Sequence, residues 1–167
     1  GFAEADPTND VCGFDAARKL AILSSIGFRA NVTFDDVLVE GIEKIDKSDI
    51  QYAKDMGYTI KLLTVALRQE NGIALNVYPA FLPDNHPLSS VKGAYNAIYV
   101  TGNIVDDVMF YGRGAGALPT ASAVMGDVIS TAQHILNGST GTGMIMTDTK
   151  RIPFYSSLKL QNSYYFR

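Results

Sequence analysis

The chain of 167 residues has a single cysteine, no tryptophan and no excess of basic residues. One cysteine cannot form an internal disulfide framework or a cysteine-rich zinc site, and such sparse usage is typical of a reducing compartment. The 14 Lys and Arg residues are scattered and the formal net charge is -3, so neither nucleic acid nor a membrane surface is an expected partner. We therefore expect a cytoplasmic protein that acts on small molecules or on other proteins.

Long apolar runs are also missing. No stretch approaches the roughly 18 consecutive apolar residues of a membrane span, and the start carries no basic segment followed by an apolar one. A hydrophobic content of 47% with 19% charged residues matches one ordinary globular domain. The chain opens without an initiator methionine, directly on loop-like sequence, so we expect it to be part of a larger protein.

The hydrophobic period divides the chain into helical and strand-like stretches. Helices with stop signals are expected over residues 15–26 before Gly27, over residues 48–58 with Ser48 as N-cap and Gly57 as stop, and over residues 119–136 before Gly138. Two alternating stretches break at ENG (residues 70–72) and TGN (residues 101–103), which predicts two hairpins. The expected fold class is α+β, with a mixed, largely antiparallel sheet of about four to five strands and helices packed on one face.

A lysine stands among apolar residues in the first predicted helix. At 100° per residue, the large apolar side chains of residues 20–26 average roughly 50° from Asp15, and Lys19 points about 40° from it. A structural lysine that snorkels to solvent is the common alternative on such a helix. Burial disfavours an ammonium while a carboxylate one turn away favours it, so the pair can tune a proton donor and acceptor near neutral pH. We interpret Lys19 and Asp15 as a functional pair.

Three carboxylates precede this helix, among them Glu4 and Asp10. Each alone is more often an N-cap or a solvated loop residue, but together they suggest a site for a cation such as a substrate ammonium group. Cys12 lies in the same segment and is an alternative nucleophile, although no histidine is close in sequence. His86 and His134 stand in no recognisable metal-ligand or base spacing, and we expect no metal site.

A second constellation is the segment MFYGRGAGALPTASAVMGDVI, residues 109–129, where Gly112, Gly114 and Gly116 alternate between a strand end and a helix. Such a turn lets the backbone approach a ligand closely, and a helix N-terminus favours a phosphate or another negative group. An ordinary tight turn explains the pattern equally well. The spacing also differs from the dinucleotide fingerprint G-x-G-x-x-G.

The two stretches together resemble homoserine dehydrogenase, specifically its central substrate-binding and catalytic domain. GFAEADPTNDVCGFDAARKLAIL is similar to the family segment G-[FY]-x-E-x-D-P-x-x-D-[VL]-x-G-x-D-x-A-x-K, and the glycine turn is similar to its G-x-G-A-G-x-x-P-T-A-x-A-V signature. The likeness covers residues 1–150. Residues 151–167 are then a C-terminal extension, whose end LQNSYYFR resembles the first strand of the regulatory ACT domain that many members carry.

The resemblance implies the reversible interconversion of aspartate 4-semialdehyde and L-homoserine with NAD or NADP, within threonine, methionine and isoleucine biosynthesis. It also implies roles for the acidic segment and the helix behind it. Lys19 becomes the catalytic lysine and Asp15 its partner, while Glu4 holds the substrate amino group and Asp10 is a further substrate contact.

The resemblance further implies that Gly112, Gly114 and Gly116 bind the cofactor, and that a homodimer forms through the sheet. The family's Rossmann domain is missing from these residues, so we expect the 167-residue chain alone to be inactive and to bind the cofactor weakly. Two alternatives stay open at this point. One is an aldehyde dehydrogenase that depends on Cys12, and the other is a non-catalytic dimerisation scaffold.

Overall fold

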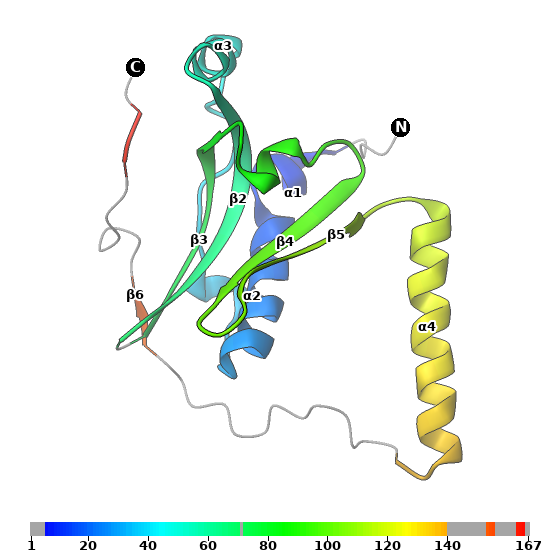
Figure 1. The fold of residues 1–167 in the computed structure, drawn as a ribbon. Coiled ribbons are helices and arrows are strands. Elements are labelled where there is room, and N and C mark those ends of the chain that lie inside the picture. Colours follow the sequence, from blue (N-terminus) through cyan, green and yellow to red (C-terminus); the bar gives the residue numbers. More distant parts are fainter. Residues whose placement is uncertain (1–5, 71, 140–152, 156–162, 166–167) are drawn as a thin grey trace. The chain divides into compact units, whose positions relative to one another are not determined.

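The computed structural model describes residues 6–70, 72–139, 153–155 and 163–165. The chain forms two compact units, one built on residues 6–81 with the described C-terminal residues and the other on residues 82–139. Figure 1 shows helices and strands in both, which confirms the predicted α+β class. Among these described residues, no helix has the length and hydropathy that a membrane crossing requires.

The first unit is organised around a central strand. Its elements are α1 (Thr8–Val11), α2 (Phe14–Phe28), the 3-10 helix η1 (Phe34–Asp36), β1 (Leu38–Val39), α3 (Lys47–Asp55), β2 (Tyr58–Gln69), β3 (Gly72–Pro83) and β6 (Phe154–Tyr155). β2 is hydrogen-bonded to β3, and the two-residue connection between them permits only an antiparallel pair. This confirms the first predicted hairpin. β1 and β6 pair with β3 in parallel, at Asn76–Val77 and at Ile73–Ala74.

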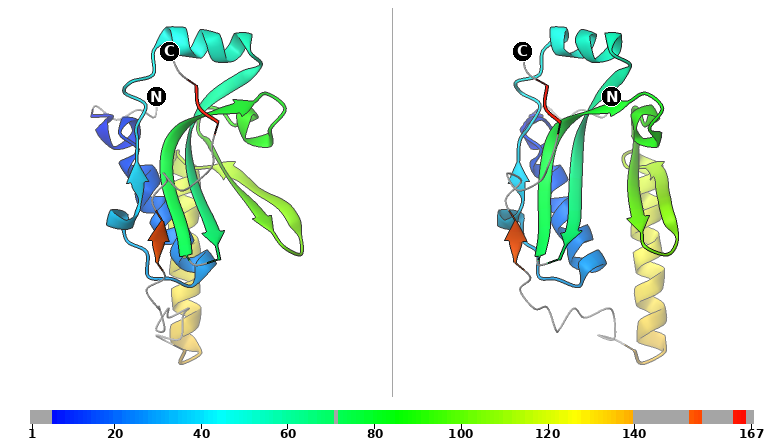
Figure 2. Two further views of the ribbon diagram at one scale, coloured as in Figure 1. Left: turned by 90° about the vertical axis from the view of Figure 1, so that its left-hand side faces the viewer. Right: turned by 60° about the vertical axis from the view of Figure 1, so that its left-hand side comes forward.

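The core of this unit lies between α2 and one face of β3, and Figure 2 shows the helix running along the sheet. The buried β3 side chains that join this cluster fall on alternate residues, because successive side chains of a strand point to opposite faces. They are Ile73, Leu75 and Val77, and the α2 residues in the same cluster are Ala17, Leu20 and Ala21. The alanines present little bulk, so the helix backbone packs close to the sheet.

The end predicted for the first helix was wrong. α2 continues through Gly27 to Phe28, and Arg29 takes the left-handed conformation (φ 51°, ψ 48°) that terminates it. The Arg29 N–H donates to the Ser25 carbonyl oxygen. A glycine is the usual residue at such a position, and here a neighbouring arginine adopts it instead.

The N-cap predicted for the second helix was also wrong. Asp46 has extended backbone angles and accepts hydrogen bonds from the N–H groups of Ser48 and Asp49, at 2.7 and 3.1 Å. Ser48 therefore lies inside α3, because the cap must precede the residues whose N–H groups it satisfies. Gly57, with a φ of 78°, confirms the predicted stop.

The second unit contains η2 (Pro87–Ser90), β4 (Tyr95–Gly102), β5 (Asp106–Arg113) and α4 (Ala117–Leu136). β4 and β5 form an antiparallel hairpin in continuous register from Tyr95↔Arg113 to Gly102↔Asp106, which confirms the second predicted hairpin. α4 starts two residues before the predicted Pro119, and Gly138 follows its end with a φ of 63°. The strands thus divide into two sheets rather than one.

The predicted C-terminal extension falls only partly within the described residues. Phe154 and Tyr155 pair with β3, and Phe154 packs against the core of the first unit. Of the stretch LQNSYYFR, residues 163–165 are described and are not in a strand. The regulatory domain suggested by this stretch remains a prediction.

Candidate functional site

The first candidate site lies where α1 meets α2. α1 carries Asp10, α2 carries Asp15 and Lys19, and two residues separate the helices. The second of these, Gly13, caps α2 in the left-handed conformation with a φ of 79°, and a Cβ there would lie 3.0 Å from Cγ1 of Val77. Glycine suits the junction both for its backbone conformation and for its contact with the sheet.

The predicted pair is formed, because Lys19 Nζ lies 2.7 Å from Asp15 Oδ2 across one helical turn. The buried setting predicted for it was wrong: the Lys19 side chain is 61% exposed and that of Asp15 45%. The apolar neighbours on the same face are exposed as well, Ile22 by 61%, Leu23 by 41% and Ile26 by 51%. The pair therefore lies on an open face of α2 that a ligand can reach.

α2 turns a different face toward the sheet. Its buried residues are Ala17, Leu20, Ala21 and Ser24, which recur at intervals of three and four. The prediction weighed only large apolar side chains, whereas close packing of a helix on a sheet favours small ones. Among the described residues, the side chain of Lys19 is not buried. A role for Lys19 in proton transfer is therefore supported only by its contact with Asp15.

Asp10 is exposed on α1, and side chains next to it tie the two helices together. Arg18 Nη1 donates a hydrogen bond to Asn9 Oδ1 at 3.1 Å, and the Arg18 guanidinium stands 5.4 Å from the ring centre of Phe34. Asn9 precedes Asp10 in α1, and Arg18 precedes Lys19 in α2. The hydrogen bond therefore joins the two helices next to these predicted site residues. Glu4, the other predicted substrate contact, lies outside the described residues.

The Cys12 side chain contacts Glu43. Its thiol donates a hydrogen bond to the Glu43 carboxylate, and this bond, with partial burial, raises the pKa of Cys12. The same bond lowers the pKa of Glu43. A catalytic thiolate requires a lowered pKa, so the raised pKa of Cys12 disfavours the alternative in which it is a nucleophile. In the described ranges, His, Cys, Asp and Glu side chains form no group of three or more suited to a metal ion.

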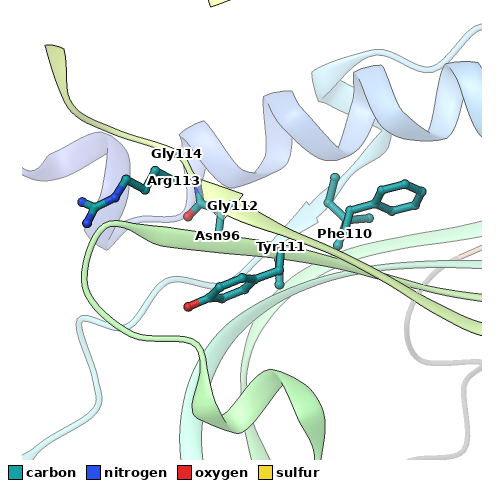
Figure 3. Close-up of a pocket in the computed structure, with 8 residues that line it drawn as sticks. Asn96, Phe110, Tyr111, Gly112, Arg113 and Gly114 are labelled. Carbon is teal, nitrogen blue, oxygen red and sulfur yellow. The ribbon is translucent and has the colours of Figure 1, made fainter. Parts of the chain in front are cut away.

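The second candidate site is a hollow of about 290 Å³ on the β4–β5 hairpin, shown in Figure 3. It is lined by Asn96, Ala97, Ile98, Phe110, Tyr111, Gly112, Arg113 and Gly114. Two of the three predicted glycines, Gly112 and Gly114, thus lie in its wall. Gly116 is the N-cap of α4 with φ 126° and ψ 151°, a conformation essentially restricted to glycine.

The two glycines in the wall differ in what surrounds them. A Cβ on Gly114 would collide with the side-chain amide of Asn96, whose Cγ would be only 2.6 Å away. The Gly114 N–H donates a hydrogen bond to the Ala94 carbonyl oxygen. Gly112 has open space where a Cβ would stand. A side chain at position 114 would therefore displace the exposed Asn96 side chain, whereas Gly112 leaves room for an approaching ligand.

Asn96 was not among the residues predicted from the sequence. It lies opposite Gly112 in the strand pairing, so its relation to the glycine turn runs across the hairpin and not along the chain. Counting outward from the predicted break at residues 101–103 would have paired Gly112 with residue 92, because the observed loop lies two residues later, at residues 103–105. Nearby, the rings of Tyr95 and Tyr111 stack at 4.8 Å and the Arg113 guanidinium stands 4.9 Å from Tyr95, so side chains brace the strand ends beside the glycines.

Comparison with known proteins covers both candidate sites. The family model described as homoserine dehydrogenase matches residues 1–129. The homoserine dehydrogenase of Bacillus subtilis is 49% identical over 145 residues, which are 87% of this chain and 34% of that protein. That of Synechocystis sp. is 51% identical over 134 residues, 78% of this chain and 31% of that one.

Solved structures agree with the sequence comparison. A homoserine dehydrogenase from Thiobacillus denitrificans is similar with a TM-score of 0.85 and 39% identity, covering 92% of this chain and 36% of that one. The homoserine dehydrogenase of S. aureus at pH 7.5 is similar with a TM-score of 0.73 and 43% identity over 80% of this chain. The chain spans about a third of the length of the curated relatives it matches.

Proposed function

The chain belongs to the homoserine dehydrogenase family, and on that premise we propose that it is the substrate-binding and catalytic part of an enzyme that interconverts L-homoserine and L-aspartate 4-semialdehyde with NAD or NADP. The observation that carries the proposal is the Lys19–Asp15 pair, at 2.7 Å on an open helix face within the matched residues. Such an enzyme would serve threonine, methionine and isoleucine biosynthesis in the cytoplasm.

Lys19 handles the proton in this proposal. In the reducing direction its ammonium group gives a proton to the aldehyde oxygen, and in the oxidising direction its amine takes the hydroxyl proton. Asp15 holds Nζ in place through the 2.7 Å contact. When bound, the nicotinamide cofactor supplies or accepts the hydride.

Asp10 and Glu4 bind the ammonium group of the amino-acid substrate in this proposal, since a carboxylate forms charge-assisted hydrogen bonds with an ammonium. The glycine turn, including Gly116, is proposed to contact the cofactor. The open space beside Gly112 fits a close approach of a ligand to the backbone. Gly114, which Asn96 braces, shapes the wall of the hollow and offers a backbone contact.

Two further parts of the protein are proposed from the family. A nucleotide-binding domain lies outside these residues, a proposal supported by the match to only a third of each relative. A second copy binds through the sheet, and two exposed apolar residues of the β4–β5 hairpin that do not line the hollow, Val100 and Val108, fit such a contact. "Full-length protein" below means these 167 residues joined to that nucleotide-binding domain.

The decisive experiment changes Lys19 in the full-length protein. We expect Lys19→Ala to lower kcat for homoserine oxidation by roughly a hundredfold or more, because general acid–base catalysis contributes that much. Lys19→Arg keeps a positive charge that cannot be deprotonated, so it should be almost as inactive. Steady-state kinetics on folded protein measures both effects. Lys54→Ala, at an exposed lysine of α3, is the matched control and should keep the wild-type rate.

The outcomes separate the proposal from its alternatives. Near-normal turnover in both Lys19 variants would falsify the assignment of Lys19. An absence of homoserine-dependent turnover in the full-length wild type would leave the dimerisation scaffold as the better description. Loss of turnover on alkylation of Cys12 alone would support the thiol-dependent alternative.

A further inference from the structure

The joint between α1 and α2, residues 11–13, is in contact with a loop from a later part of the chain. Residues 40–43 directly follow β1 and pass the joint. The Glu40 N–H donates to the Val77 carbonyl oxygen at 2.8 Å, which fixes the start of the loop to β3. The Ile42 N–H donates to the Val11 carbonyl oxygen at 2.9 Å, which fixes its middle to the last residue of α1.

Gly41 makes the closest approach. A Cβ at this position would lie 2.7 Å from Cα of Cys12 and nearer still to the carbonyl oxygen of Val11. Both are backbone atoms, so no side-chain rotation relieves the overlap. The backbone of residue 41 reaches the joint only because it is a glycine.

Glu43 adds a side-chain contact on the same joint, because its carboxylate accepts the hydrogen bond from the Cys12 thiol. The loop thus contacts Val11 through a backbone hydrogen bond. It contacts Cys12 through a close backbone approach and a hydrogen bond between thiol and carboxylate. These two residues stand directly between Asp10 on one side and Gly13, the cap of α2, on the other.

We propose that the loop of residues 40–43, through Gly41 and Glu43, is a positioning element that sets Asp10 against Asp15 and Lys19. The proposal rests on the proposed function. There, Asp10 binds the substrate ammonium group while Lys19 serves the oxygen at the far end of the same small molecule. The joint fixes the spacing between these two contacts, so a shift of the joint changes how well the amino-acid substrate fits. The proposed cofactor contacts lie on the glycine turn of residues 112–116, so we expect cofactor binding not to change with this spacing.

The test compares Gly41→Ala with Gly27→Ala in the full-length protein. Gly27 lies inside α2 with nothing near its would-be Cβ, so it controls for the effect of adding a methyl group. We expect Gly41→Ala to raise KM for L-homoserine roughly tenfold or more, since a small misplacement of substrate contacts has effects of that size. KM for the nicotinamide cofactor should stay within about twofold, and Gly27→Ala should match the wild type in both.

A merely structural role predicts a different result. Gly41→Ala would then lower the melting temperature and the active fraction, and hence kcat, with both KM values unchanged, and that result would overturn the proposal. If Gly41→Ala does not fold, Glu43→Ala decides in its place. A homoserine KM raised about threefold or more, with normal cofactor KM, supports the positioning role, and an unchanged value contradicts it.

The controls separate this inference from the function on which it rests. A full-length wild type without homoserine-dependent activity counts against the proposed function itself. An active wild type with an unchanged homoserine KM in the loop variants counts only against the positioning role. Cys12→Ser keeps a hydrogen-bond donor to Glu43 and should retain the wild-type KM, while Cys12→Ala should behave like Glu43→Ala.

Discussion

At the scale of single residues, the Cys12 thiol shows how one contact changes reactivity. The hydrogen bond to Glu43, together with partial burial, raises the pKa of Cys12, so less of the reactive thiolate is present near pH 8. We expect iodoacetamide to alkylate Cys12 more slowly than a thiol in an unstructured peptide. Glu43→Gln removes the negative charge that disfavours the thiolate, so it should lower the pKa of Cys12 and speed the reaction. Mass spectrometry over time measures both rates.

The chain has a single cysteine, so each alkylation event reports on this site alone. Glu40→Gln removes a carboxylate from the same loop, and Glu40 is not among the groups that shift Cys12. Its alkylation rate should therefore stay near the wild-type rate. An equally slow reaction in Glu43→Gln would show that the carboxylate does not protect the thiol.

Gly114 gives a second residue-scale prediction, concerning stability. A Cβ there meets the Asn96 amide, so Gly114→Ala should lower the free energy of unfolding by about 0.5–1.5 kcal/mol, the cost of forcing the Asn96 side chain out of its rotamer. Gly112→Ala, two residues earlier in β5, is the matched control and should cost much less, because the space beside it is open. Urea titration followed by circular dichroism provides the values.

A compensating change sharpens this test. Asn96→Ala removes the amide that a Cβ at position 114 would strike, so the double variant Asn96→Ala/Gly114→Ala should recover most of the stability lost in Gly114→Ala. Strictly additive losses in the double variant would mean that the two residues do not interact.

At the scale of elements, α2 has two apolar faces, of which one is buried against the sheet and the other is exposed. The buried face carries Ala17 with no exposed surface, while Ile22 on the other face is 61% exposed. Ala17→Leu should destabilise the chain by about 1–3 kcal/mol because no space exists between helix and sheet. Ile22→Ala should change the unfolding free energy by only about 0.5 kcal/mol. Chemical denaturation of the 167-residue chain compares them, and a larger loss in Ile22→Ala would reverse the assignment of the two faces.

At the scale of the whole molecule, the central question is what these residues can do without the rest of the enzyme. They contain no G-x-G-x-x-G segment and match about a third of each curated relative. We expect the purified chain to fold but to oxidise no homoserine and to bind NAD or NADP weakly. Nucleotide fluorescence titration and a turnover assay test this, with the full-length protein as control. Robust turnover by the 167 residues alone would refute the division of labour proposed here.

The sequence by itself determined the longer elements and the family. Period and turn signals placed three helices and two hairpins, because hydrophobic spacing and glycine or asparagine turns are local properties of the chain. The i, i+4 spacing of Asp15 and Lys19 likewise predicted their contact, since four residues make about one helical turn. The two long motifs identified the family that the comparisons show.

Only the tertiary structure decided which side chains are buried and what braces the candidate sites. The face of α2 against the sheet is set by close packing on β3, so the small residues Ala17 and Ala21 are inside while Ile22 is exposed. Gly41 and Asn96 contact chain segments that are distant in sequence. Gly41 lies against residues 11–12, and Asn96 lies opposite Gly112 in the strand pairing. Local patterns carry no record of such contacts, because they depend on how elements pack and not on the residues beside them.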